Sequence, residues 1–522
     1  MPKFKPYNTK QDAMVVINYE QQLQPGTFEH AIHYLIENKL DLSVFYPRYQ
    51  NDSTGRPAYD PAILLKIILF AYSKGITSSR EIQWCCETNI IFKALSCDTV
   101  PHFTTLAAFV SQRSQEIEAL FEQILLVCFK QGLLGNELFA IDGCKMSSNA
   151  SKEWSGSFKE LEKKRKKLKQ QIQYHLKAHQ HLDKSESRDE ARQQRTQQTI
   201  ETLDQACEKI DQFLKTHSPR KGHGKQGKEV KSNITDNESA KFTGSKGTLQ
   251  GYNGLAAVDK KHQIIIDAQA FGSGQEQHTL QPILESVKQK YKRLGFSNDI
   301  YQDNMIVTAD TGFAKESNME YLNKNNINAF IPDNQFRSRD PKFAMQKQTY
   351  GKRHQNEKSK HSKIFSSNEF DLDPVNKTCR CPAGENLWLK TEKHDPYGNQ
   401  KLFFEGRLSK CRQCTLITQC MRNPDAPNTR TGNGRQVSFI IKKGKRPPNY
   451  TDWMKRRVDS EKGKEIYSHR MSVVEPVFAN IGTNKRLNRF SLRGKQKVQG
   501  QWQLYCMIHN IEKLQNYGNL GD

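Results

Sequence analysis

The stretch NMIVTADTGF, residues 304–313, joins an apolar run directly to a carboxylate. Residues 305–309 predict a short buried strand, and Asp310 follows it before Thr311 and Gly312 break the pattern. A lone Asp at the end of a strand is usually a turn residue or a helix cap. A functional interpretation of Asp310 therefore depends on whether the rest of the chain supplies companions for it.

A second apolar run that carries an acid is NELFAIDG, residues 136–143, which predicts a strand ending on Asp142. A hairpin over 252–271 follows after an insertion, and then come a helix over 279–295, the Asp310 strand, a helix over 315–326 and a strand over 327–332. This order predicts an α/β fold with a mixed sheet and helices on its faces.

Asp142 and Asp310 would meet if their strands are parallel neighbours, because both acids follow the carboxyl ends of these strands. Two adjacent carboxylates repel each other unless a cation lies between them. Two Mg²⁺ ions about 3.5–4 Å apart are the usual solution for phosphodiester chemistry. The pattern therefore favours a metal-dependent reaction on a phosphodiester.

The charge balance points to an acidic partner. The 522 residues include 80 Lys and Arg against 56 Asp and Glu, which gives a net charge of +24. Nucleic acid is the usual partner of such a chain, and an acidic membrane surface is the rival. The longest apolar run, 62–72, is too short to span a membrane and contains Lys66. The N-terminus does not resemble a signal peptide, so we expect a cytoplasmic protein with no membrane association.

Helical patterns dominate two further regions. Residues 61–75, 78–87 and 101–132 predict an all-helical N-terminal domain, either a DNA reader of the helix-turn-helix type or a packing domain. Residues 158–182 and 190–216 predict a helical hairpin with a turn at 183–190. Its seam is formed by Ile200, Leu203, Cys207, Ile210 and Leu214.

Basic tracts accompany this hairpin. The run KKRKKLK, 163–169, is either a solvated face or a surface that follows phosphates, and 218–233 predicts a flexible basic linker. Two further basic tracts, KKGKRPP (442–448) and KRLNRFSLRGKQK (485–497), invite the same two interpretations.

Four segments together resemble a known family, the DDE transposases of bacterial insertion sequences. They are residues 55–95 with PHFTTLAAF after them, FAIDGCKMSSNASK (139–152), TADTGF (308–313) and YSHRMSVVEPVFANI (467–481). The resemblance implies a ribonuclease-H-like catalytic core that binds two Mg²⁺ or Mn²⁺ ions. It also implies Asp142, Asp310 and Glu475 as the metal ligands and catalytic acids.

The C-terminal motif departs from the pattern common in that superfamily, which is Tyr, two residues, Arg, three residues, Glu, six residues, Lys. Tyr467 and Arg470 fit, but the Glu comes one position late, at 475. The Lys position is Gly482, and the nearest lysine is Lys485. The resemblance implies DNA or phosphate binding by Tyr467, Arg470 and Lys485. Because Pro476 disfavours helical backbone at Glu475, we expect this acid at the start or kink of a helix.

Five of the 12 cysteines lie within residues 379–420. The pair Cys411 and Cys414 forms a C-x-x-C knuckle, which Cys381 and Cys420 could complete as a structural zinc site. Cys379 would then be spare or would replace Cys381. The alternative is a set of buried free thiols.

The predicted organisation combines these elements. A helical N-terminal domain for DNA binding or assembly (1–132) precedes a catalytic core (135–150, 235–335 and 460–516), which is interrupted by the hairpin with its linker (151–234) and by the Cys-rich insertion (336–459). The resemblance implies a transposase that acts on double-stranded DNA, at terminal inverted repeats and target sites, as a homodimer or larger assembly at the bacterial nucleoid. The alternatives are a ribonuclease-H-like nuclease that does not join strands and a DNA-binding regulator without catalysis.

Overall fold

The computed structural model describes residues 16–49, 57–183, 190–222, 227–244, 247–343, 364–394, 399–429, 432–442 and 449–520. The chain forms two compact units, Met1–Asn334 with Met454–Asp522, and Gln335–Trp453. Most of the predicted turn at 183–190 and of the basic tract at 442–448 lies outside the described residues. Within these ranges, no helix is both long and apolar enough to cross a membrane.

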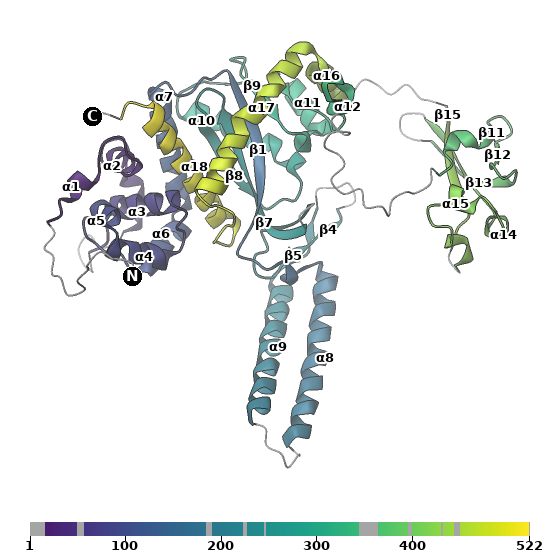
Figure 1. The fold of residues 1–522 in the computed structure, drawn as a ribbon, viewed down its shortest axis with the longest axis horizontal. Helices are drawn as coiled ribbons and strands as arrows, with labels where there is room; N and C mark the ends of the chain where they lie inside the picture. Colours follow the sequence, from purple (N-terminus) through teal and green to yellow (C-terminus); the bar gives the residue numbers. More distant parts are fainter. Residues whose placement is uncertain are drawn as a thin grey trace, which may run out of the picture. The chain divides into compact units, whose positions relative to one another are not determined.

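A mixed sheet forms the centre of the first unit (Figure 1). Its strands, in spatial order, are β10 (Ala329–Phe330), β9 (Ile306–Ala309), β1 (Leu138–Ser147), β7 (Gly247–Asp259) and β6 (Ala240–Gly244), while β8 (Ile265–Phe271) also pairs with β7. The pairs β10–β9 and β9–β1 are parallel, and the others are antiparallel. The predicted mixed sheet is therefore confirmed, with β6 as an additional strand.

The sheet is covered on both faces. Successive residues of a strand point to opposite faces, yet β7 is buried without interruption from Gln250 to Val258. Helices follow the strands and cover them: α10 (Leu280–Arg293), α11 (Glu316–Lys324), α16 (Tyr450–Asp459), α17 (Glu461–Ala479) and α18 (Lys495–Tyr517).

Helix α18 covers β8 with amide side chains. Asn510 accepts a hydrogen bond from the backbone N–H of Ile265 at 2.8 Å and donates one to its carbonyl at 2.9 Å. Gln499 makes the same double contact with Ala270 and Ala268. Buried backbone N–H and C=O groups at the edge of a sheet need hydrogen-bond partners other than a neighbouring strand. The side-chain amides of Asn510 and Gln499 are such partners for β8.

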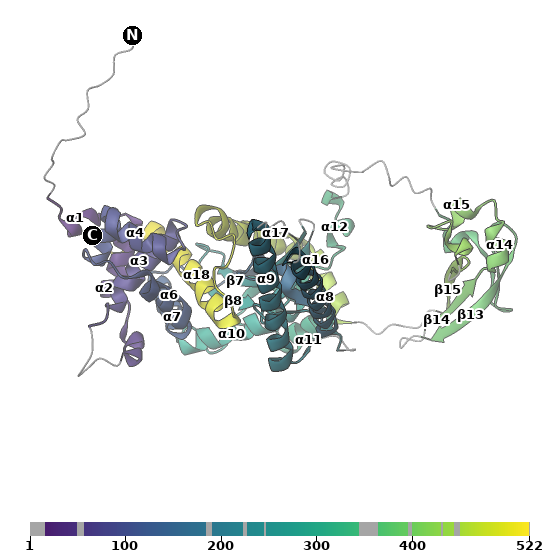
Figure 2. The ribbon, with the colours of Figure 1, turned by 90° about the horizontal axis from the view of Figure 1, so that it is seen from below.

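Six helices of the N-terminal segment form a bundle beside α18. Four of them contact α18: α2 (Phe28–Asn38), α3 (Pro61–Ser73), α6 (Phe103–Gln112) and α7 (Ser114–Lys130). The other two, α4 (Ser79–Thr88) and α5 (Ile90–Ser96), pack against helices of the bundle. Helix α18 lies along α7 in both views (Figures 1 and 2). Because it is enclosed by this bundle and the sheet, α18 is buried on all sides from Gly500 to Ile511.

The predicted helical hairpin is present as α8 (Phe158–Asp183) and α9 (Glu190–Thr216). Its predicted seam is buried at Ile200, Cys207 and Ile210. The expectation of a flexible linker over 218–233 is wrong for the described part, because three short strands form there: β3 (Arg220–Lys221), β4 (Glu229–Val230) and β5 (Ser232–Asn233). The buried Asn233 side chain fixes this segment through hydrogen bonds to Ser151 and Ser155.

The second unit contains an antiparallel sheet of five strands: β11 (Asp371–Asp373), β12 (Thr378–Arg380), β13 (Asn386–His394), β14 (Gln400–Glu405) and β15 (Gln436–Lys442). A small core supports it, formed by Phe370, Cys379, Leu387, Leu402, Phe404 and Val437. Two short helices, α14 (Leu408–Arg412) and α15 (Ile417–Cys420), lie between the last two strands in sequence.

Candidate active site

The two aspartates follow neighbouring parallel strands. The paired residues of β1 and β9 run from Leu138 with Ile306 to Ile141 with Ala309. Asp142 and Asp310 are the next residues on each strand, so the pairing brings both acids to the same end of the sheet. The two strands are thus parallel neighbours, as predicted.

Asp142 lies inside its strand, and the expectation that the strand ends there is wrong. Strand β1 continues to Ser147, because β7 pairs with its other edge from Phe139 to Ser147. Only the parallel pairing ends at Ile141. The carboxylate of Asp142 therefore projects from rigid backbone, and its Oδ1 accepts a hydrogen bond from the N–H of Gly143 at 2.8 Å.

Arg470 on α17 bridges the two acids. Its Nη1 lies 2.7 Å from Oδ2 of Asp142, and its Nη2 lies 3.9 Å from Oδ1 of Asp310. The arginine is 8% exposed, and its guanidinium stands 5.9 Å from the ring centre of Tyr467. Arg470 thus supplies the positive charge that two neighbouring carboxylates require.

The pKa values of this cluster follow from burial and charge. Burial raises the pKa of Asp142, Arg470 opposes this effect, and the negative charge of Asp310 adds to it. Burial also works against the charge of Arg470, but Tyr467, Asp142 and Asp310 together raise its pKa. Arg470 thus partly offsets the effect of burial on the Asp142 carboxylate.

Helix α17 continues through Pro476, so the expectation that a helix starts at Glu475 is wrong, while the alternative of a kink there stays a prediction. Proline lacks the N–H that would bond to the carbonyl of Ser472, four residues earlier. The Nε2 of Gln263 donates a hydrogen bond to that carbonyl at 3.0 Å. This tertiary contact satisfies the freed carbonyl oxygen and helps the helix to continue.

Glu475 is exposed and does not join the two aspartates in this structure. It lies five positions after Arg470, which turns its side chain by about 140° around the helix axis. The buried face of α17 carries Arg470, Val473, Val474 and Val477 instead. Within the described ranges, no three His, Cys, Asp or Glu side chains lie close enough in their present positions to hold a metal ion.

Asp142 and Asp310 nevertheless fit a divalent metal ion by their chemistry. Carboxylate oxygens are the ligands that Mg²⁺ prefers, and a cationic group of the chain already occupies the space between them. Asp310 keeps 41% of its side chain exposed, so one of the two carboxylates remains accessible to solvent.

Lys485 is buried away from the acids. It is 1% exposed and forms an ion pair with Glu512. Burial lowers its pKa, and Glu512 partly offsets this. Because its ammonium group is shielded from solvent, this arrangement argues against a direct phosphate contact by Lys485.

Basic side chains near the sheet serve partly as internal anchors. In the run 163–169, Arg165 pairs with Asp211 at 2.6 Å, and Lys164 donates a hydrogen bond to the carbonyl of Glu153. Lys163, Lys166 and Lys167 are exposed. Part of this tract therefore holds the hairpin in place, and the rest faces solvent.

Sequence analysis missed Glu276 and Lys145. Lys145 on β1 forms an ion pair of 3.0 Å with Glu276, which lies in a short turn directly before α10. A Cβ on Gly312 would collide with Oε2 of Glu276, so this acid lies against the loop that follows Asp310. The Gly-rich break at 272–274, between a strand and a helix, was the available signal, but only the fold reveals the contact.

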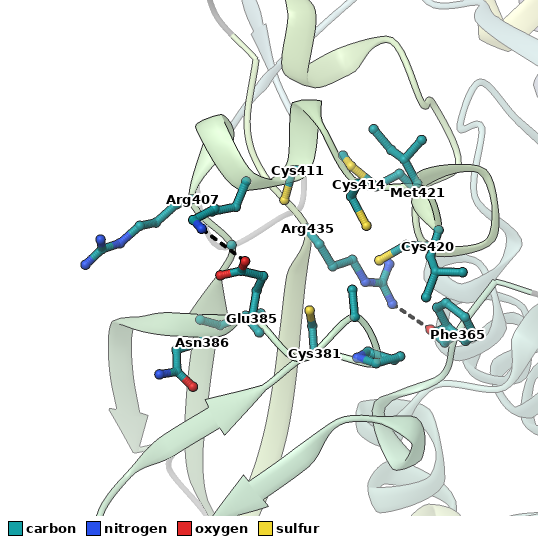
Figure 3. A pocket seen from close by; sticks show the side chains of 17 residues that line it. Phe365, Cys381, Glu385, Asn386, Arg407, Cys411, Cys414, Cys420, Met421 and Arg435 are labelled. Carbon is teal, nitrogen blue, oxygen red and sulfur yellow. Dashed lines mark hydrogen bonds and ion pairs between the residues drawn. The ribbon is translucent and has the colours of Figure 1, made fainter.

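The four predicted zinc ligands line one pocket of the second unit (Figure 3). They come from the turn after β12, from α14 and the loop after it, and from α15: Cys381, Cys411, Cys414 and Cys420. Burial raises the pKa of Cys420 to about 11; Arg435 opposes the shift, and the other three thiols add to it. Cys379 points elsewhere, into the core of the sheet.

Two family models match parts of the chain. A model described as a transposase DDE domain matches residues 380–515, and a model described as a transposase domain (DUF772) matches residues 17–112. The first match includes α17 with Arg470, and the second covers most of the N-terminal helices. No curated protein and no solved structure matches the chain.

Proposed function

Because the chain belongs to the DDE transposases of insertion sequences, we propose that it binds the ends of its element, cuts phosphodiester bonds there and joins the 3′-hydroxyl ends to target DNA. We further propose that the mixed sheet is a ribonuclease-H-like core. The observation that carries this proposal is the position of Asp142 and Asp310 directly after the last parallel pair of β1 and β9, on either side of Arg470.

Transposases with a DDE domain generally use a divalent metal, usually Mg²⁺. Asp142, Asp310 and Glu475 are the proposed ligands of two such ions. When bound, the metal would activate the attacking oxygen and stabilise the leaving oxygen. Hard carboxylate ligands leave coordination positions free for water and phosphate oxygens, which supports the choice of Mg²⁺ or Mn²⁺.

Arg470 has two roles in this proposal. In the metal-free protein it neutralises Asp142 and Asp310. Once a metal ion takes over that task, the guanidinium becomes available for a bidentate contact with a DNA phosphate. Tyr467, next to it, would stack on or hydrogen-bond the strand end.

Glu475 must change its position to join the aspartates, because it is exposed on a different side of α17 from Arg470. The proposal therefore includes a rearrangement of α17 when metal and DNA bind. The release of Arg470 from Asp142 would remove one contact that fixes the present orientation of the helix.

DNA binding, which the family implies, is supported by the net charge of +24. We propose that the exposed lysines of 163–169 follow the phosphates and that the N-terminal helices contribute to recognition of the inverted repeats. Assembly as a homodimer or larger complex at the nucleoid completes the proposal.

A structural zinc ion is a further part of the proposal. It would be held by Cys381, Cys411, Cys414 and Cys420, whose side chains line the same pocket. Four thiolates leave no open position for a substrate, so the ion would stabilise a unit with a small core rather than take part in catalysis.

An excision assay tests the proposed function. The purified protein is incubated with Mg²⁺ and a linear DNA that carries the element with its flanking sequence, together with a supercoiled target. Joined products that depend on the element ends support a transposase. Cleavage without joined products would indicate a nuclease, and binding without cleavage would indicate a regulator.

A further inference from the structure

Glu276 lies against the loop that follows Asp310, on the face of β1 opposite to the side chain of Asp142. It begins a short turn, Glu276–His278, that packs against Thr311–Phe313, the turn directly after Asp310. Its partner Lys145 is three residues beyond Asp142, and an odd offset along a strand leads to the other face. Carboxylates therefore reach this end of the sheet from both sides.

We propose that Glu276 is an additional metal-binding carboxylate of the active site, and that its ion pair with Lys145 occupies it in the metal-free protein. This inference rests on the proposed function, because it assumes that Asp142 and Asp310 bind a divalent metal. It goes beyond that function because it adds an acid from outside the four segments that carry the family resemblance.

Two glycines let buried side chains pack closely against the backbone beside the two aspartates. Gly143 directly follows Asp142, and a Cβ there would lie 2.8 Å from Oδ1 of Asn253. Gly312 follows Asp310 by two residues, and a Cβ there would collide with Glu276 itself. A side chain at Gly143 would displace Asn253, and a side chain at Gly312 would displace Glu276.

Asn253, which contacts Glu276, carries a buried oxygen that lacks a hydrogen-bond partner among the described residues. The side chain of Asn253 is fully buried, and its Nδ2 donates a hydrogen bond of 3.4 Å to Oε1 of Glu276. Its Oδ1, which lies over Gly143, has no hydrogen-bond partner within the described part of the chain. A buried amide oxygen normally accepts a hydrogen bond. A water molecule of a hydrated metal ion is a suitable donor for it.

Each acid in this region is paired with a cationic side chain. Lys145 pairs with Glu276, and Arg470 pairs with Asp142 and Asp310. The side chain of Glu276 is only 17% exposed, whereas that of Lys145 is 41% exposed, so the lysine can swing into solvent. A divalent cation that replaces both partners would release Glu276 toward the aspartates.

The alternative is that Glu276 only neutralises Lys145. The two roles predict opposite results for Lys145→Met. If Glu276 binds metal, removal of the competing lysine strengthens metal binding. If Glu276 serves only the ion pair, loss of either partner has the same structural effect.

The test is a titration of the full chain with Mn²⁺, followed by electron paramagnetic resonance of the free ion. We expect Glu276→Gln to weaken Mn²⁺ binding by about 10- to 100-fold and Lys145→Met to strengthen it. The control is Glu285→Gln, on the exposed side of the following helix, where the carboxylate accepts a hydrogen bond from Gln289. This variant should bind Mn²⁺ like the wild type.

Asp142→Asn separates the two proposals. If it loses Mn²⁺ binding while Glu276→Gln binds like the wild type, the inference is wrong and the proposed catalytic site stands. If Lys145→Met weakens binding as Glu276→Gln does, the ion pair alone explains Glu276, and the inference is also overturned. A wild-type protein that binds no Mn²⁺ would remove both proposals.

Discussion

Arg470 donates a hydrogen bond of 2.7 Å to Asp142, a residue 328 positions earlier in the chain. Its second terminal nitrogen reaches toward Asp310, so a single guanidinium joins the three segments that carry the family resemblance within the core. In the absence of metal, this contact offsets the repulsion between two acids that directly follow the last parallel pair of β1 and β9.

Affinity for double-stranded DNA should fall steeply with salt, because Lys and Arg side chains displace counterions from the phosphates. Replacing Lys163, Lys166 and Lys167 together by alanine should reduce the slope of log affinity against log salt, by roughly one for each lost phosphate contact. Fluorescence anisotropy at several salt concentrations measures this slope. Binding that stays the same between low and moderate salt would contradict the proposed interface.

Purified protein should contain about one zinc ion, because the four thiols that line the pocket would close around it as a tetrahedral site. Cys414→Ser should release the ion and destabilise the second unit, because metal binding by such a small unit is coupled to its folding. Cys379→Ala is the control: this cysteine lies in the core and should leave the zinc content unchanged. Metal analysis after purification under reducing conditions decides the matter, and absence of zinc in the wild type would refute the site.

His509 should make the protein less stable in mild acid. Burial lowers its pKa to about 3, against 6.5 in the unfolded chain. Because the folded pKa is depressed, the neutral histidine contributes fully above pH 6.5, and this contribution is lost as the pH falls toward 3. The loss is up to about 5 kcal/mol. His509→Gln cannot titrate, so its free energy of unfolding should fall less over this range. Identical pH profiles in urea unfolding would argue against a buried neutral His509.

The buried ion pair of Lys290 and Asp267 offers a test of the core. The two side chains are at most 1% exposed, and Lys290 Nζ lies 2.6 Å from Asp267 Oδ1. Lys290→Met should cost about 3–5 kcal/mol, because it leaves an unpaired buried carboxylate. Adding Asp267→Asn should recover part of this loss. A double variant that is as unstable as the sum of the two single variants would show that the pair is not coupled.

Local patterns sufficed to predict many elements of the fold. The apolar runs around Asp142 and Asp310 form the predicted strands, and α3 begins at Pro61, where the side chain of Asp60 caps it through the N–H of Ala62. These features depend on residues within a few positions of one another, so they are visible in the sequence.

Long-range contacts account for most of what local patterns did not predict. Strand β1 continues past Asp142 because a strand more than 100 positions later pairs with it. Helix α17 continues through Pro476 because Gln263, on the β7–β8 turn, bonds to the freed carbonyl. Glu276 is likewise remote in sequence from the two aspartates, and only the packing of its turn against Gly312 brings it near. Such contacts leave no periodic signal in the chain.

The third acid requires its own comparison. Glu475→Gln should abolish strand cleavage, whereas Glu465→Gln, an exposed acid on the same helix, should remain active. Both variants should fold and bind DNA, because neither removes a buried contact. Loss of activity at Glu465 with full activity at Glu475 would show that the third acid was assigned to the wrong position.

The most direct test of the account is the rate of strand cleavage by Asp310→Asn on DNA that carries the element ends, in Mg²⁺ or Mn²⁺. Asparagine serves turns and caps as well as aspartate does, so the substitution affects cleavage only if Asp310 binds metal. We predict a loss of several orders of magnitude with DNA binding intact, while Asp303→Asn, an exposed acid just before the same strand, keeps wild-type cleavage. Cleavage by Asp310→Asn at the wild-type rate would contradict the proposed catalytic site.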